Sequence, residues 1–298
     1  MKITAEKLQE IIESHGKWLR NKEGGQRADL RDADLRDADL QRATLQRANL
    51  QCADLRDADL QRATLRDADL QRATLQGAYL QDADLQRADL QRADLQRADL
   101  QRANLQRANL QRADLQGADL RDADLQGANL QGANLQCADL RDADLQRATL
   151  RDADLQRATL QGAYLQDADL QRADLQRADL QRADLQRANL QRANLQRADL
   201  QGADLRDADL QGANLQGADL PDGIYQVVGC GSANRCTTYD SINDRVICGC
   251  WNDDNGNHLA AFEERIEAVY GAEGSDPNQQ YYNEYMSAIA FFKAISKS

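Results

Sequence analysis

An uninterrupted five-residue repeat over residues 26–220 constrains the fold of this chain more than any other feature. Each of its 39 units carries Ala at the third position and Leu at the fifth, while the other three positions are almost entirely Asp, Asn, Thr, Arg, Gln and Gly. One unit holds too little apolar surface to fold alone, so it must bury its Ala and Leu against copies of itself. The sequence therefore predicts a solenoid.

The period of five matches neither the 3.6-residue period of an α-helix nor the alternation of one long β-strand. It suits a chain that turns a corner after every unit. Because Ala and Leu are two residues apart, both point to the same side of a locally extended backbone, and the residue between them points outward. Small Ala beside larger Leu is then expected to fill a narrow interior.

The pattern Ala-(Asp/Asn/Thr)-Leu-x-x resembles the pentapeptide repeat family, and the repeats cover about two thirds of the chain. The resemblance implies an all-β solenoid: a right-handed quadrilateral β-helix with four pentapeptides per coil and about ten coils. Some members of this family are acidic rods that mimic duplex DNA and bind DNA gyrase. The resemblance therefore offers gyrase binding as one candidate function.

A longer repeat is superimposed on the short one, since residues 51–135 recur as residues 136–220 with a single difference. The offset of 85 residues equals 17 pentapeptides, which is four coils and one further side. In a four-sided coil the second copy is rotated by a quarter turn relative to the first. We therefore expect Tyr79 and Tyr164, which are equivalent in sequence, to face different directions. The sequence does not distinguish a recent natural duplication from deliberate construction.

The compartment is predicted from the cysteines and the N-terminus. Cys52 and Cys137 occupy identical contexts more than four coils apart, too far for a disulfide, which favours free thiols and a reducing environment. The first residues are charged and lack an apolar signal core, and no segment is apolar over the length of a bilayer span. We expect a cytoplasmic protein without a membrane partner.

The segments that flank the repeats are expected to cap them. Residues 1–25 contain an amphipathic helix over residues 4–20, with Thr4 as its N-cap and His15 as a packed or partly exposed helix residue. Its apolar face is predicted to be formed by Leu8, Ile11, Ile12 and Leu19. An open coil would otherwise expose leucines and unpaired backbone groups.

Residues 221–298 are predicted to form a small α+β domain with three short strands followed by two helices. It resembles cap domains of some bacterial and phage pentapeptide repeat proteins, a resemblance that implies no activity. Phe291 and Phe292 give the last helix more aromatic surface than a cap of this size needs on one face. A homodimer through this domain is therefore a hypothesis.

The same domain holds the most reactive-looking group of residues, namely Cys230, Cys236, Cys248, Cys250 and His258. Zinc-binding thiolates normally come as C-x2–4-C pairs in tight turns, whereas Cys248 and Cys250 alternate along an expected strand. Structural thiols are therefore favoured over a zinc site, and both over a catalytic Cys–His pair. Glycine-rich phosphate loops, nucleophile elbows and paired catalytic carboxylates are absent from the sequence, so we expect no cofactor and no enzyme.

The outward positions mix charges, with 27 Arg against 34 Asp in the repeats and a net charge of -12 for the chain. Residues 20 apart are expected to meet on adjacent coils, which pairs Arg62 and Arg102 with Asp82. Direct nucleic-acid binding is not expected, and interleaved arginines also disfavour DNA mimicry, which needs a predominantly negative face. The sequence predicts a non-enzymatic scaffold or protein-binding solenoid. Gyrase binding and an enzymatic or zinc-binding role of residues 221–298 are the alternatives.

Overall fold

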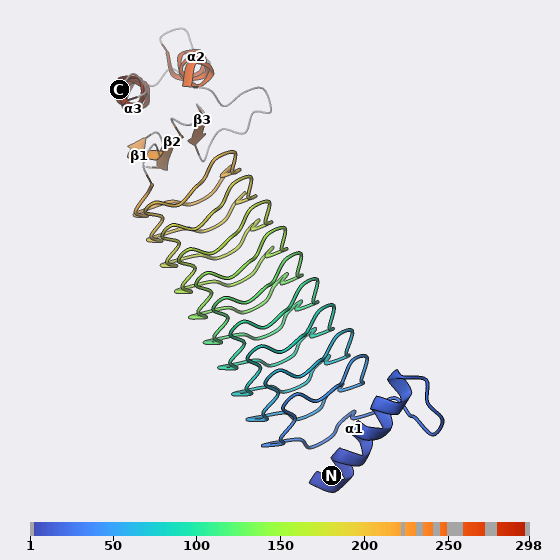
Figure 1. Cartoon of the computed structure of the whole chain (residues 1–298). Helices are drawn as coiled ribbons and strands as arrows, with labels where there is room; N and C mark the ends of the chain where they lie inside the picture. Colours follow the sequence, from blue (N-terminus) through green and yellow to red (C-terminus); the bar gives the residue numbers. More distant parts are fainter. Residues whose placement is uncertain are drawn as a thin grey trace.

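The computed structural model describes residues 3–221, 224–230, 235–240, 245–248, 259–271 and 279–295. Helix α1 (Ala5–Leu19) precedes the repeats, and strands β1 (Ile224–Cys230), β2 (Arg235–Asp240) and β3 (Arg245–Cys248) follow them, before helices α2 (Leu259–Tyr270) and α3 (Gln279–Ile295). The repeats form a stack of coils with α1 at one end and the remaining elements at the other (Figure 1).

Four pentapeptides complete each coil of this stack. The outward residue in the middle of each side forms a parallel bridge with the residue 20 positions later, from Asp29 with Asn49 to Asp199 with Asp219. The predicted fold, a right-handed quadrilateral β-helix, is confirmed. Four-fold closure arises because every unit has the same length and the same turn, so each side stacks directly on its counterpart in the next coil.

The two copies of the long repeat are set a quarter turn apart, as predicted. Tyr79 lies in the ladder between Asp59 and Asp99, whereas Tyr164 lies in a different ladder, between Asp144 and Asp184. Identical sequence therefore presents its side chains in different directions.

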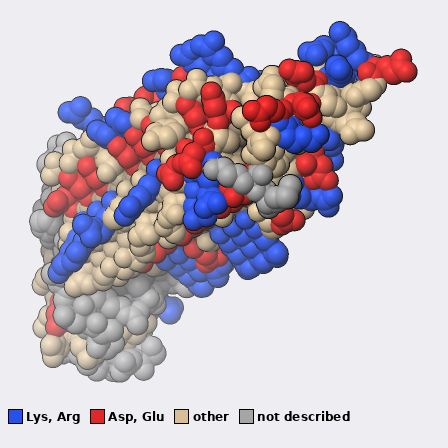
Figure 2. Space-filling view, turned by 90° about the horizontal axis from the view of Figure 1, so that it is seen from below, with Lys and Arg blue, Asp and Glu red and all other residues tan. Residues whose placement is uncertain are grey.

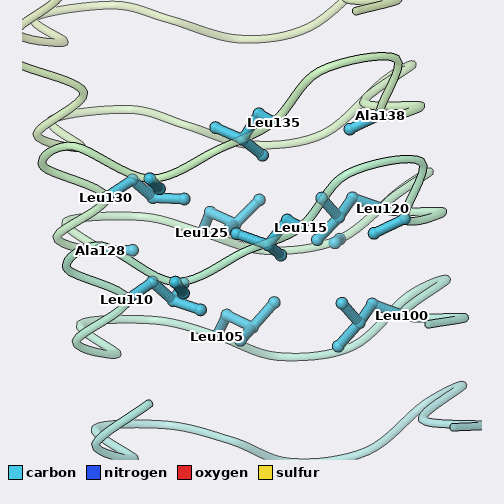
Figure 3. Packing of buried hydrophobic residues seen from close by; sticks show 14 of the residues in the cluster. Leu100, Leu105, Leu110, Leu115, Leu120, Leu125, Ala128, Leu130, Leu135 and Ala138 are labelled. Atoms are coloured by element: carbon cyan, nitrogen blue, oxygen red, sulfur yellow. The ribbon is translucent and has the colours of Figure 1, made fainter. Parts of the chain in front are cut away.

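The interior contains little besides Ala and Leu. Between Leu45 and Leu200, no inward Ala or Leu is more than 2% exposed. Figure 3 shows equivalent leucines directly above one another, such as Leu105 below Leu125 and Leu110 below Leu130. Each buried leucine contributes about 1.5–3 kcal/mol before conformational entropy is subtracted, so the rod is stabilised by many equal increments.

Hydrogen bonding explains why Asp and Asn dominate the outward position. In a typical unit, the N–H groups of Arg92 and Leu95 donate to the following coil and that of Asp94 to the preceding one, while the N–H of Ala93 closes the turn. The fifth N–H, that of Gln91, donates to the side-chain Oδ1 of Asp89 at 3.1 Å. A short acceptor two residues earlier therefore satisfies the one backbone donor that the coils leave free.

The corners force an unusual backbone conformation on ordinary residues. The second turn residue has a positive φ at every corner from Asp32 to Gly217, for example 58° at Arg92, and most of these residues are not glycine. Only this second position is left-handed, as in type II β-turns, which normally favour glycine there. The free cysteines Cys52 and Cys137 occupy the same exposed position. Stacking of the coils therefore overrides the preference of this turn position for glycine.

Helix α1 covers the first coil. The Oγ1 of Thr4 accepts the backbone N–H of Lys7 at 3.3 Å, which confirms the predicted N-cap. Leu8 is buried in the same apolar cluster as the rod, and Ile11 and Ile12 pack against that cluster. The chain then turns back at Gly25, where a Cβ atom would lie 2.3 Å from the backbone nitrogen of Trp18. Only glycine allows this close approach.

His15 completes the cover with hydrogen bonds. It is fully buried, its Nδ1 accepts the N–H of Ala28 at 3.0 Å, and its Nε2 donates to the carbonyl of Gln46 at 2.9 Å. Trp18 stacks on its outer side with ring centroids 5.4 Å apart. Burial lowers the pKa of His15 below its ordinary value, against the opposing effect of the Gln46 bond. The predicted packing residue thus also caps the unpaired backbone of the first coil.

At the other end, β1, β2 and β3 form an antiparallel sheet in that order. Successive residues of β1 belong to different cores, because side chains alternate along a strand. Ile224 is buried with the end of the rod, whereas Tyr225 packs against a second cluster built from the sheet, α2 and α3. Among the described residues, no helix is both long and apolar enough to cross a membrane.

The second cluster is aromatic. Phe262 meets Tyr285 edge-on, and Phe292 packs against Tyr239 with centroids 5.1 Å apart. Phe292 is therefore a core residue, and its predicted availability for a dimer contact is wrong. The side chain of Phe291 lies outside the described residues.

Candidate interaction surfaces

The outside of the rod consists of four faces, each formed by the outward residues in the middle of one side, and four corners formed by the turns. Figure 2 shows the result: basic and acidic side chains gather into separate rows that run along the rod. The rows arise because residues 20 apart stack on one another. Charges that alternate in sign along the sequence are therefore separated into rows of like charge in the structure.

One face is predominantly acidic. Its ladder runs from Asp39 to Asp219 in steps of 20 residues, and eight of its ten positions are Asp, the others being Tyr79 and Thr159. We call this ladder the acidic face. The order of residues does not reveal this face, because its members are never closer than 20 positions apart.

Arginines neutralise some aspartates of this face and some of its neighbouring faces. Arg56 bonds Asp54 at 2.6 Å and Arg121 bonds Asp119 at 2.6 Å, so the partner is the aspartate two residues earlier rather than the adjacent one. The hydrogen bond from Arg56 holds the pKa of Asp54 below its usual range.

The predicted pairs between coils are confirmed around Asp82. Arg102 approaches this carboxylate at 2.7 Å and Arg62 at 3.6 Å. The hydrogen bond from Arg102 lowers the pKa of Asp82. These pairs are open to solvent, and exposed pairs contribute only about 0–1 kcal/mol each.

Tyr79 and Tyr164 are the large hydrophobic residues that stand out from the described surface, at 46% and 47% exposure. Each projects from a flat face between two aspartates of the neighbouring coils. Beside them, Gln81 and Gln166 each hold a side-chain oxygen that is buried without a hydrogen-bond partner. An exposed amphipathic ring is typical of a surface that another protein covers.

Two corners carry arginine on three consecutive coils. We call Arg72, Arg92 and Arg112 the first arginine ladder, and Arg157, Arg177 and Arg197 the second. All six side chains are exposed, and none forms a hydrogen bond or ion pair with another described residue. An open groove is lined by two arginines of each ladder: one of about 320 Å³ by Arg92 and Arg112, and one of about 300 Å³ by Arg177 and Arg197.

The cysteine group of the C-terminal domain is described only in part. Cys230 lies at the end of β1 opposite Arg235, and Cys248 lies in β3 opposite Thr237, on either side of Cys236. The register thus brings three cysteine backbones to one end of the sheet. Their side chains, together with Cys250 and His258, lie outside the described part of the chain. Within that part, no group of three or more His, Cys, Asp or Glu residues could hold a metal ion.

Comparison with known proteins identifies the repeats. A sequence model described as pentapeptide repeats matches in eight copies, over residues 28–67, 68–107, 88–127, 123–162, 153–192 and 188–222. No curated protein matches the chain.

Several solved structures are similar. HetL, a pentapeptide repeat protein involved in heterocyst differentiation regulation in the cyanobacterium Nostoc sp. strain PCC 7120, is 38% identical over 75% of this chain and 98% of its own, with a TM-score of 0.55. Rfr23 from the cyanobacterium Cyanothece 51142 is 42% identical over 28% of this chain and 58% of its own, with a TM-score of 0.28. QnrB1, a plasmid-mediated fluoroquinolone resistance protein, is 18% identical over 52% and 78%, with a TM-score of 0.41.

Proposed function

Because the chain belongs to the pentapeptide repeat family, we propose that it is a non-enzymatic scaffold that binds another protein through the outer faces of its rod. The regular core leaves only outward side chains for recognition, and these are arranged in straight rows. The similarity to HetL, a protein involved in a regulatory process, supports a regulatory binding role.

The observation that carries this proposal is the exposure of Tyr79 and Tyr164 on otherwise polar faces. Tyrosine is enriched at the centres of protein interfaces, because it buries a large rigid surface while its hydroxyl keeps a hydrogen bond. Tyr79 interrupts the acidic face, which favours a partner with a basic surface around an apolar pocket. Tyr164 presents an equivalent anchor a quarter turn away.

The test compares proteins captured from the native host by the full chain and by a variant carrying Tyr79→Thr and Tyr164→Thr. Threonine already occupies the same outward position at Thr74 and Thr149, so the variant is expected to fold normally. A partner captured by the wild type and lost with the variant is the expected result. The proposal fails if the set of captured proteins is unchanged.

The matched control is Asn109→Thr, which alters the outward position of another face and leaves both tyrosines in place. This variant should retain the partner. Loss of the partner with the control alone would place the interface on that face instead of at the tyrosines.

Gyrase binding by DNA mimicry is the second candidate, and the acidic face is the observation that favours it. Eight aspartates in one ladder form a negative row of the kind that a basic DNA-binding surface attracts. The second arginine ladder works against it, because its arginines stand two residues before Thr159, Asp179 and Asp199 of that face. A DNA-binding surface that approached this part of the rod would meet repelling charges.

A gyrase supercoiling assay separates the two candidates. Inhibition or drug protection at micromolar concentrations of the chain would favour mimicry, and neutralising Asp59 and Asp99 of the acidic face to Asn should then abolish the effect. An unchanged supercoiling rate would leave the scaffold as the better function.

Four further propositions complete this assignment. The chain divides into an N-terminal cap at 1–25, the β-helix at 26–220 and a C-terminal cap domain at 221–298. A cytoplasmic location is supported by the exposed free thiols of the rod. A zinc or enzymatic role of residues 221–298 is a lesser alternative, which metal analysis of the purified protein would test. A homodimer through this domain is testable by light scattering.

A further inference from the structure

The two arginine ladders contain three like charges in line on consecutive coils. Stacked strands are about 4.8 Å apart, so neighbouring arginines repel one another unless an anion lies between them. At some other corners this repulsion is relieved, since Arg102 and Arg187 bond Asp82 and Asp167 on the adjacent coil at 2.7 and 2.8 Å. The ladders have no such partner among the described residues.

The nearest outward carboxylates are held away from the first ladder. The Oδ1 of Asp94 accepts the backbone N–H of Gln96 at 3.1 Å, and the Oδ2 of Asp114 accepts the side-chain amide of Gln96 at 2.6 Å. Both bonds draw the carboxylates towards the next corner. The guanidinium groups of Arg92 and Arg112 therefore remain available to a ligand.

The grooves beside the ladders supply further hydrogen-bond donors, and they leave space for a ligand. Gln91, Gln111 and Gln131 line the first groove with Arg92 and Arg112, and equivalent residues line the second. Each groove ends at a glycine: the stems of Arg112 and Arg197 pass 3.6 Å from the position that a Cβ of Gly132 and Gly217 would occupy. A longer residue there would fill the groove.

The charge of the linings is almost purely positive. Asp152 is the one acid among the residues that line the first groove, and it is neutralised by Arg172 at 2.8 Å; no acid lines the second. Neither lining contains an aromatic or aliphatic side chain. The grooves therefore lack a stacking surface for nucleic-acid bases and an apolar pocket for peptide side chains.

We propose that each arginine ladder binds a linear phosphate chain of three or more phosphates, laid along the rod. Guanidinium groups match phosphate oxygens in pairs of parallel hydrogen bonds, and glutamine amides bond the bridging and terminal oxygens without adding charge. A straight row of cations suits a ligand whose charges also lie in a row. The phosphate chain could come from a free oligophosphate or from the triphosphate of a nucleotide.

Isothermal titration of the full chain with tripolyphosphate at about 0.15 M salt tests the proposal. We expect two equivalent sites per chain and affinity for tripolyphosphate at least about tenfold above that for orthophosphate, because one phosphate engages fewer arginines. Equal affinity for ATP would identify the triphosphate group of a nucleotide as a source, and weaker binding of ATP would favour a free oligophosphate.

Variants assign the binding to the ladders. Arg92→Gln with Arg112→Gln should remove one of the two sites, Arg177→Gln with Arg197→Gln the other, and all four changes should abolish binding. The control, Arg102→Gln with Arg187→Gln, removes the same charge from the same turn position but from arginines that are already paired. It should keep both sites.

Several outcomes would overturn the proposal. These are tripolyphosphate binding no tighter than orthophosphate, equal losses in the ladder and control variants, or an oligonucleotide of deoxythymidine that binds more tightly than tripolyphosphate. Thermal melts of each variant separate loss of binding from loss of folding.

Discussion

The rod and the C-terminal domain bury apolar surface in opposite ways. The rod repeats one contact, Leu on Leu and Ala on Ala, between residues 20 positions apart, so its stability is approximately a sum of equal terms between neighbouring coils. The C-terminal core joins Tyr239, Phe262, Tyr285 and Phe292 from separate elements, and each contact occurs once. The rod should therefore tolerate substitutions at many outward positions but not at the inward Ala and Leu. The C-terminal core, in contrast, depends on a few large side chains.

The largest loss of stability is expected when a charged side chain is placed in the core of the rod. Leu125→Asp places a carboxylate at a fully buried position, where loss of the leucine alone is worth about 2–5 kcal/mol and burial of the charge adds to it. Urea unfolding should show this loss. The neighbouring outward change Asp124→Asn, which keeps the acceptor for Gln126, should shift stability by only about 0.5 kcal/mol. Equal effects would contradict the inward assignment of Leu125.

A comparable but local loss is expected from Phe292→Ala. Removal of this buried ring should cost about 3–5 kcal/mol, and the damage should be confined to the C-terminal domain. The near-ultraviolet circular dichroism of its aromatic cluster should disappear while the far-ultraviolet signal of the β-helix remains. Simultaneous melting of both signals would show that the two regions form one cooperative unit.

The N-terminal end should respond to pH through His15. Its folded-state pKa lies below the ordinary value of 6.5, so its contribution is complete above that pH and declines as the pH falls below it, when the unfolded state binds more protons. Protonation of Nδ1 would also break its hydrogen bond with the Ala28 N–H, because both groups would then be donors. The protection of the Ala28 amide against hydrogen exchange, measured relative to its intrinsic exchange rate, should therefore fall below about pH 6.5.

The control for this experiment is His15→Leu, which should lose about 1–3 kcal/mol at neutral pH because Ala28 and Gln46 lose their partner. In this variant, the change in exchange rate between pH 7 and pH 5.5 at Ala28 should reduce to the intrinsic pH dependence of amide exchange. A response equal to that of the wild type would assign the effect to another group.

The smallest effect concerns the corners. Arg107 has a φ of 57° and is not glycine, so Arg107→Gly should be more stable than Arg107→Ala by about 1 kcal/mol. The comparison with alanine removes the contribution of the arginine side chain itself. Equal melting temperatures of the two variants would show that the turn stores no appreciable strain.

The repeat pattern was sufficient to predict the architecture because one rule holds for every unit. Ala and Leu two residues apart define the inward side, and an invariant unit length forces stacking, so the four-sided coil and the quarter-turn offset of Tyr164 from Tyr79 followed without further information. The helix with its Thr4 cap and the strands and helices after Pro221 were also predictable, since their signals are local.

The candidate surfaces were predicted less well. The acidic face, the arginine ladders and the second role of His15 all depend on residues that meet only after the chain has closed its coils. Phe292 was misassigned to the surface because helical periodicity does not reveal that Tyr239 of β2 covers it.

The sequence by itself thus determined the coil, its core and the spacing of equivalent positions, because these follow from a local rule applied 39 times. Only the tertiary structure decided which charges are neutralised and which remain free. The reason is physical: electrostatic pairing depends on distances across adjacent coils and on the direction in which each carboxylate is held, and neither is fixed by the order of residues within a unit.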